Sequence, residues 1–203
     1  QAQKRVEGYN FDMRKQLLDY DDVLRRQREI IYAERNKILE SSEVHEMVHD
    51  IFENALDQTI EANLTENKKN VDATNLVKSL EMMGLQDEKA IHVSEIEGKS
   101  IQETKEYCLN KMWNGYEDEI KLVKDQFMPF EKTVVLRNID RNWIQHIDQM
   151  DKLRGGIYLR SYAQNNPLQQ YVEEGFAMFD EMNHRINREI AFFLLKVRVQ
   201  ENA

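Results

Sequence analysis

The chain has 203 residues, 41% of them apolar, and its 37 acidic side chains outnumber its 28 basic ones to give a net charge of −9. This balance disfavours a nucleic-acid partner or an anionic lipid surface, because both repel an acidic protein. The longest apolar run covers six residues, 190–195, whereas a helix needs about 20 to span a bilayer.

Residues 1–40 are predicted to form one long helix. Apolar residues recur there at intervals of three and four, and no proline or glycine follows Gly8. This narrow stripe includes Leu17, Leu24, Ile31 and Ile38. Gln27 and Glu34 interrupt the stripe, so we expect the helix to lie against other elements rather than to pair with a second copy of itself.

Residues 41–128 are predicted to form a small helical subdomain that holds the excess acid, with nineteen acidic and nine basic side chains. Ser41 and Ser42 supply a cap for its first helix. That helix has a broad apolar face that extends to Ile60.

Two further helices are predicted in this subdomain. The first covers residues 72–83 and ends at Gly84, which can adopt the left-handed conformation common after a helix. The second runs over residues 101–127, although Gly115 weakens its helical propensity.

Residues 129–203 are predicted to form a long antiparallel helical hairpin, which makes the fold class all-α. Pro129 suits the first turn of a helix, where a backbone N–H has no partner within the helix. An apolar stripe continues from there to Ile157, and a second stripe runs from Val172 to Val197. Two long helices joined by a short turn pack side by side.

The turn of the hairpin is predicted at residues 161–165. Asn166, Pro167 and Gln169 have the form of an N-cap, a first-turn proline and a capping-box partner for the second helix. Tyr162 lies at the tip, where it either folds back on the hairpin or is exposed as a contact residue.

Residues 45–49 read HEMVH and match the H-E-x-x-H pattern of zinc peptidases. On a helix, this spacing places His45 and His49 on one face beside Glu46. No H-x-x-G-x-x-H extension follows to supply a third ligand, and His45 adjoins the apolar side of its helix. A chance match in a Glu-rich sequence is therefore the favoured interpretation.

Motifs for other chemistry are absent from the sequence. It has no G-x-x-x-x-G-K-[ST] phosphate loop, no G-x-G-x-x-G after a strand and no nucleophile elbow, so the chain is not expected to act as an enzyme by itself. A lone cysteine, Cys108, excludes an internal disulfide and fits a reducing compartment such as the cytosol. The chain opens on Gln1 rather than Met, which indicates a piece of a longer protein.

Two long stretches resemble the SecA family of bacterial protein-translocation motors. The start of the family's helical scaffold is similar to AQKRVEGYNFDMRKQLLDYDDVLRRQREIIY (residues 2–32), and its two-helix finger is similar to RNWIQHIDQMDKLRGGIYLRSYAQNNPLQQY (residues 141–171). The resemblance makes 1–40 the long scaffold helix, 41–128 the helical wing, and 129–203 the two-helix finger with the end of the scaffold.

The resemblance implies a role in protein export. A SecA motor couples ATP hydrolysis to the movement of unfolded preproteins through a SecY-type membrane channel, and this part of it is non-catalytic. ATP and Mg would bind motor domains that precede Gln1, so no cofactor is expected in this chain. The implied partners are the preprotein, the channel and the motor domains of the parent chain, with no nucleic acid. The implied location is the cytoplasm, at the inner face of the bacterial cell membrane.

In this scheme the loop of the hairpin contacts the preprotein and the mouth of the channel, and its tip tyrosine matches Tyr162. The implied contact residues are Arg160, Ser161, Tyr162, Ala163 and Gln164. Two alternatives from other classes stay open: a generic helical scaffold or partner-binding protein, and a zinc peptidase that uses His45, Glu46 and His49. Motor sequence upstream of the chain would distinguish a SecA fragment from a generic helical scaffold. The zinc content of the purified protein would distinguish a zinc peptidase from both.

Overall fold

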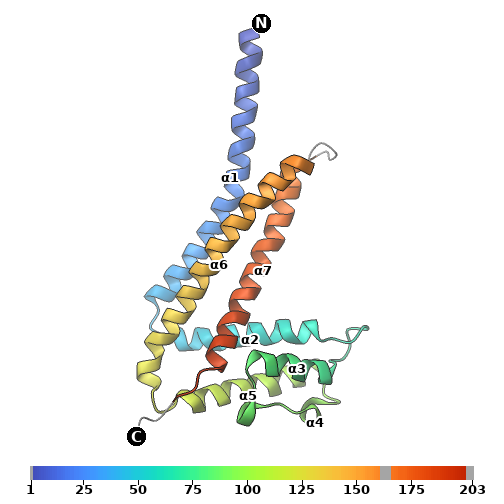
Figure 1. Ribbon diagram of the computed structural model, residues 1–203, viewed down its shortest axis with the longest axis vertical. Helices are drawn as coiled ribbons and strands as arrows, with labels where there is room; N and C mark the ends of the chain where they lie inside the picture. The colour runs from blue at the N-terminus through green and yellow to red at the C-terminus, as the bar shows by residue number, and fades with distance from the viewer. Residues whose placement is uncertain (1, 161–165, 200–203) are drawn as a thin grey trace. The chain divides into compact units, whose positions relative to one another are not determined.

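The computed structural model describes residues 2–160 and 166–199 of the chain (Figure 1). Within these ranges the backbone is helical, without strands other than an isolated bridge between Leu64 and Val71. The helices are α1 (Ala2–Glu40), α2 (Val44–Ala62), α3 (Ala73–Met83), α4 (Val93–Ile96), α5 (Ile101–Ile120), α6 (Lys124–Arg160) and α7 (Pro167–Leu195), with a short 3-10 turn η1 (Asp87–Lys89). The all-α prediction is confirmed.

Two predicted helix ends, Gly84 after α3 and Asn166 before α7, are confirmed. The Asp72 side chain caps α3 by accepting a hydrogen bond from the Asn75 N–H at 3.0 Å, and Gly84 ends that helix with φ of 121°. The Asn166 side chain caps α7 by accepting from the Gln169 N–H at 3.2 Å. Each cap satisfies a backbone group that the helix itself leaves unpaired.

The predicted cap of α2 is wrong. Neither Ser41 nor Ser42 is the N-cap, because α2 begins at Val44 and Glu43 takes the capping position without a capping hydrogen bond from its side chain. The Ser41 hydroxyl instead accepts a hydrogen bond from the Glu43 N–H at 2.9 Å, within the turn that separates α1 from α2. The serine therefore shapes the connection rather than the helix end.

The predicted end of the helix over residues 101–127 and the predicted start of the helix that follows it are also wrong. Helix α5 ends at Ile120, and α6 begins at Lys124, so Pro129 lies inside a helix rather than in its first turn. Tyr116 and Glu131 explain the break, because their side chains meet at 2.6 Å although they are 15 residues apart. A straight helix would separate them by about 22 Å.

The described residues divide into two compact units. The hairpin unit comprises residues 1–39 and 139–183, and the acidic unit comprises residues 40–138 and 184–203. Both α6 and α7 contribute residues to each unit. The division into domains 1–40, 41–128 and 129–203 stays a prediction.

The core of the hairpin unit joins its three helices. In Figure 1 the upper parts of α6 and α7 lie beside each other. One buried cluster consists of Tyr20 from α1, Met150, Leu153 and Ile157 from α6, and Tyr171 from α7. Burial of such large side chains is the main source of stability for the packed helices.

The core of the acidic unit forms where α2 packs against α5. Fully buried side chains at this junction include Phe52 and Leu56 from α2 and Cys108, Met112 and Tyr116 from α5.

Gly115, which weakens the helical propensity of α5, has a packing role. A Cβ atom at this position would lie 2.8 Å from Cγ of Lys89, so the glycine lets η1 approach α5. The unfavourable propensity is therefore offset by a close contact between two segments of the acidic unit.

Candidate functional site

The predicted contact loop falls largely outside the described residues. Ser161, Tyr162, Ala163 and Gln164 all lie there, and Arg160 is the last residue of α6, with its side chain also outside the description. The structure therefore describes the helices that lead into and out of the loop.

Both helices are well packed in the turns that adjoin the loop. Ile157, three residues before the end of α6, is fully buried, and Tyr171, in the second turn of α7, is 2% exposed. The Tyr20 ring from α1 lies against the Tyr171 ring with 5.0 Å between their centroids. The segments that flank the loop are thus held against α1 by buried contacts.

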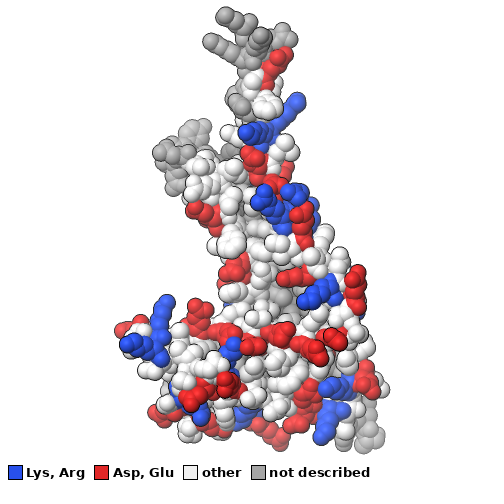
Figure 2. Space-filling model, turned by 180° about the vertical axis from the view of Figure 1, so that it is seen from behind, with Lys and Arg blue, Asp and Glu red and all other residues white. Residues whose placement is uncertain are grey.

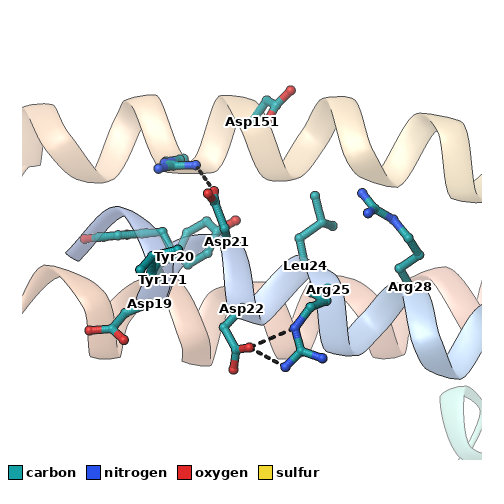
Figure 3. Close-up of a pocket in the computed structure, with 11 residues that line it drawn as sticks. Asp19, Tyr20, Asp21, Asp22, Leu24, Arg25, Arg28, Asp151 and Tyr171 are labelled. Carbon is teal, nitrogen blue, oxygen red and sulfur yellow. Dashed lines mark hydrogen bonds and ion pairs between the residues drawn. The ribbon is translucent and has the colours of Figure 1, made fainter. Parts of the chain in front are cut away.

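A groove of about 600 Å³ borders this aromatic pair in the hairpin unit (Figure 3). Tyr20 and Tyr171 lie next to each other there, and Leu24 stands between α1 and α6. The remaining lining residues are mostly charged: Asp19, Asp21, Asp22, Arg25, Arg28, Asp151 and Arg154, together with Leu18. The groove combines an aromatic wall with charged edges.

Ion pairs hold several of these charged side chains. Arg154 donates to Asp21 at 2.8 Å, and its guanidinium lies 5.3 Å from the centre of the Tyr20 ring. Hydrogen bonding from Arg25 lowers the pKa of Asp22, and burial raises the pKa of Tyr171. The Arg154–Asp21 pair thus joins α6 to α1 beside the groove.

A buried polar cluster lies deeper in the hairpin unit, and the sequence analysis did not identify it. Gln27, which interrupts the apolar stripe of α1, is 7% exposed and bonds to both α6 and α7. Its partners are the fully buried ring of His146 and the backbone carbonyl of Gly175. The polar interruption of the stripe was the sequence signal for this cluster.

His45 of the HEMVH motif is held by two carboxylates rather than left open for a metal. Its Nδ1 lies 2.8 Å from Oε1 of Glu131, and its Nε2 lies 2.5 Å from Oε1 of Glu117. A zinc ligand needs a ring nitrogen with a free lone pair directed at the ion. The arrangement therefore disfavours the peptidase hypothesis, in which His45 and His49 bind one ion.

The other two residues of the motif, Glu46 and His49, do not share the carboxylate partners of His45. Glu46 is exposed, whereas the His49 ring packs edge-on against Trp113, with 4.9 Å between the centroids. The potential ligand atoms of His49 gather with those of Asp50 and Glu53, within 4.8 Å of one another. Lys105 lies 2.8 Å from Glu53 and occupies this carboxylate.

Glu131 is the centre of a charged cluster that joins α2, α5 and α6. Its side chain is fully buried and accepts a hydrogen bond from the Tyr116 hydroxyl at 2.6 Å. Burial and this carboxylate raise the pKa of Tyr116. Burial also acts to raise the pKa of Glu117, but hydrogen bonds from His45 and Lys124 outweigh it and lower that pKa. The cluster links three helices within the acidic unit.

The surface of the acidic unit carries many carboxylates. Figure 2 shows Asp and Glu side chains over much of the face it presents. Along α2, acidic residues recur at helical spacing at Glu46, Asp50, Glu53, Asp57 and Glu61. None of the described helices combines the length and the low charge needed to cross a membrane.

The sequence matches the family described as SecA Wing and Scaffold domain over residues 1–198. The match spans the helices α1 to α7. The chain therefore belongs to the SecA wing and scaffold domain family.

Proposed function

We propose that this chain is a non-catalytic module of a SecA-like preprotein translocase, which couples an ATPase motor to the movement of secretory preproteins through a SecY-type channel. The observation that carries the proposal is the family match over residues 1–198. ATP and Mg would bind motor domains of the same parent chain. The module would work in the cytoplasm, at the inner face of the cell membrane.

Within this module, the loop of the hairpin is proposed to contact the preprotein and the channel. The contact residues are Arg160, Ser161, Tyr162, Ala163 and Gln164. Burial of Ile157 and Tyr171 supports this assignment, because packed helices on both sides of a contact segment hold it more precisely than loose ones would. An aromatic side chain can contact many sequences through apolar area alone, as a translocase must.

The test compares Tyr162→Ala with Tyr162→Phe in the full-length motor. Preprotein transport into membrane vesicles that contain the channel should fall severely for alanine and be largely kept for phenylalanine, because the contact depends on the ring. Thermal stability should stay within about 0.5 kcal/mol of the parent in both variants, because the proposal makes Tyr162 a contact residue rather than a packing residue.

Tyr171→Ala is the matched control on the same hairpin. Tyr171 is 2% exposed, so its loss should lower both stability and transport. If Tyr162→Ala behaved like this control, with transport falling in proportion to stability, Tyr162 would be a packing residue and the proposed contact would be wrong. Full transport by Tyr162→Ala would contradict the proposal as well.

A further inference from the structure

The apolar stripe of α1 that packs against the hairpin contains a buried polar residue, Gln27. Leu24 and Ile31 flank Gln27 at helical spacing, and among the described residues of α1 Gln27 is the buried polar side chain. An apolar residue would be the default at such a position. Burial of an amide is unfavourable unless its donor and acceptor are both paired.

Both ends of the Gln27 amide are paired, each with a different arm of the hairpin. Nε2 donates to the carbonyl oxygen of Gly175 in α7 at 3.0 Å, and Oε1 lies 2.7 Å from Nε2 of His146 in α6. Because the amide oxygen can only accept, His146 carries a proton on Nε2 and donates it. The side chain of Gln27 thus links α1 to both α6 and α7 through hydrogen bonds.

The packing around Gln27 leaves little freedom for other arrangements. A Cβ atom at position 175 would lie 2.8 Å from Cε of Met150 and 3.9 Å from Nε2 of Gln27, so Gly175 permits this close approach. The rings of Trp143 and Phe179 lie 5.6 Å and 5.7 Å from the His146 ring. The three polar groups therefore meet in a small space enclosed by large side chains.

We propose that Gln27 is a positioning residue that clamps both arms of the hairpin to α1, so that the parts of the three helices within the hairpin unit move together. Apolar contacts are non-directional, and alone they would allow either arm to roll or shift on α1 at small cost. Hydrogen bonds are directional, and a buried polar residue in an apolar seam selects one arrangement of helices. This role concerns the hairpin unit itself and does not depend on the proposed function.

The test separates the stability of the unit from the uniqueness of its arrangement. Gln27→Met removes both hydrogen bonds with a side chain of similar length, and Gln27→Met with His146→Leu replaces both side-chain partners by apolar groups. Gln16→Met, at an exposed position of α1, is the matched control. Amide hydrogen exchange of residues 139–157 and 171–183 reports local opening of the unit.

Distances between spin labels report the arrangement. Labels are placed at two exposed alanines, through Ala33→Cys in α1 and Ala177→Cys in α7. The native Cys108 is fully buried, and burial raises its pKa to about 12, so it stays unlabelled in the folded chain.

Gln27→Met should raise the local opening constant about 10- to 100-fold, because it leaves the buried His146 donor without its acceptor. The double variant should recover to within about threefold of the parent, since paired apolar replacements are nearly neutral. The distribution of spin-label distances in the double variant should nevertheless be broad, whereas the parent and Gln16→Met each give one narrow distance. A double variant with a narrow distance like the parent's would show that apolar packing alone positions the hairpin. Unchanged exchange in Gln27→Met would also overturn the proposal.

Discussion

The phenol ring of Tyr20 lies against that of Tyr171, with 5.0 Å between the ring centroids, so one aromatic pair joins α1 to the second turn of α7. The two residues are far apart in sequence, yet they are 6% and 2% exposed. The pair holds the start of α7 on α1 immediately after the loop.

Tyr171→Ala should therefore destabilise the hairpin unit by about 3 to 5 kcal/mol, the usual range for removing a buried aromatic ring. Hydrogen exchange of α7 and thermal unfolding both measure this loss. Tyr32→Ala is the control, because Tyr32 is 49% exposed and should change stability by about 1 kcal/mol or less. Equal losses in the two variants would contradict the role given to the pair.

The buried cluster around Glu131 predicts a large effect from a single substitution in the acidic unit. Glu131→Ala removes the carboxylate that lies 2.8 Å from His45 and 2.6 Å from the Tyr116 hydroxyl. Loss of one member of a buried charged cluster costs about 3 to 5 kcal/mol. Glu46→Ala, on the exposed side of α2, should change stability by about 0.5 kcal/mol or less. Chemical unfolding followed by tryptophan fluorescence compares the two variants.

Glu95 predicts a pH dependence of the acidic unit. Hydrogen bonds from the His92 backbone, Tyr107 and Lys111 lower the pKa of Glu95 from 4.5 to about 2. A lowered pKa in the folded state means that the ionised carboxylate stabilises the fold above pH 4.5, and that this contribution is lost as the pH falls toward about 2.

Glu95→Gln should accordingly lower the melting temperature of the chain at pH 7, and the difference from the parent should shrink between pH 4.5 and about 2. Melting curves at half-unit pH steps measure it. A difference that stayed constant down to pH 2 would show that the carboxylate charge contributes nothing. Glu97→Gln, at an exposed neighbouring position, is the control for a general charge effect.

Replacing either of two helical glycines by alanine should change the stability of the chain, but in opposite directions. Gly155 in α6 has open space where a Cβ would be, so Gly155→Ala should stabilise the chain by about 0.5 to 1 kcal/mol through helix propensity. At Gly115 the added Cβ would lie 2.8 Å from the buried Lys89 stem, so Gly115→Ala should destabilise it by about 1 to 3 kcal/mol. Thermal unfolding of the two variants decides between propensity and packing; a stabilising Gly115→Ala would show that Lys89 can move aside.

Features that rest on local interactions were predictable from the sequence. The 3-4 spacing of apolar residues predicted α1, the all-α class and the two helices of the hairpin, because a helix places residues three and four apart on one face. The cap at Asn166 was predictable for the same reason, since a capping side chain bonds a backbone group three residues away.

Contacts between segments far apart in the chain were decided by the tertiary structure alone. The break between α5 and α6 follows from the meeting of Tyr116 with Glu131, and the two carboxylates beside His45 come from α5 and α6, which the HEMVH motif could not indicate. Gln27 was visible in the sequence as an interruption of a stripe. Its partners, His146 and Gly175, lie 119 and 148 residues further along the chain. Hydrophobic periodicity predicts which face of a helix is buried, but hydrogen bonds between distant residues depend on distances and angles that exist only once the helices have packed.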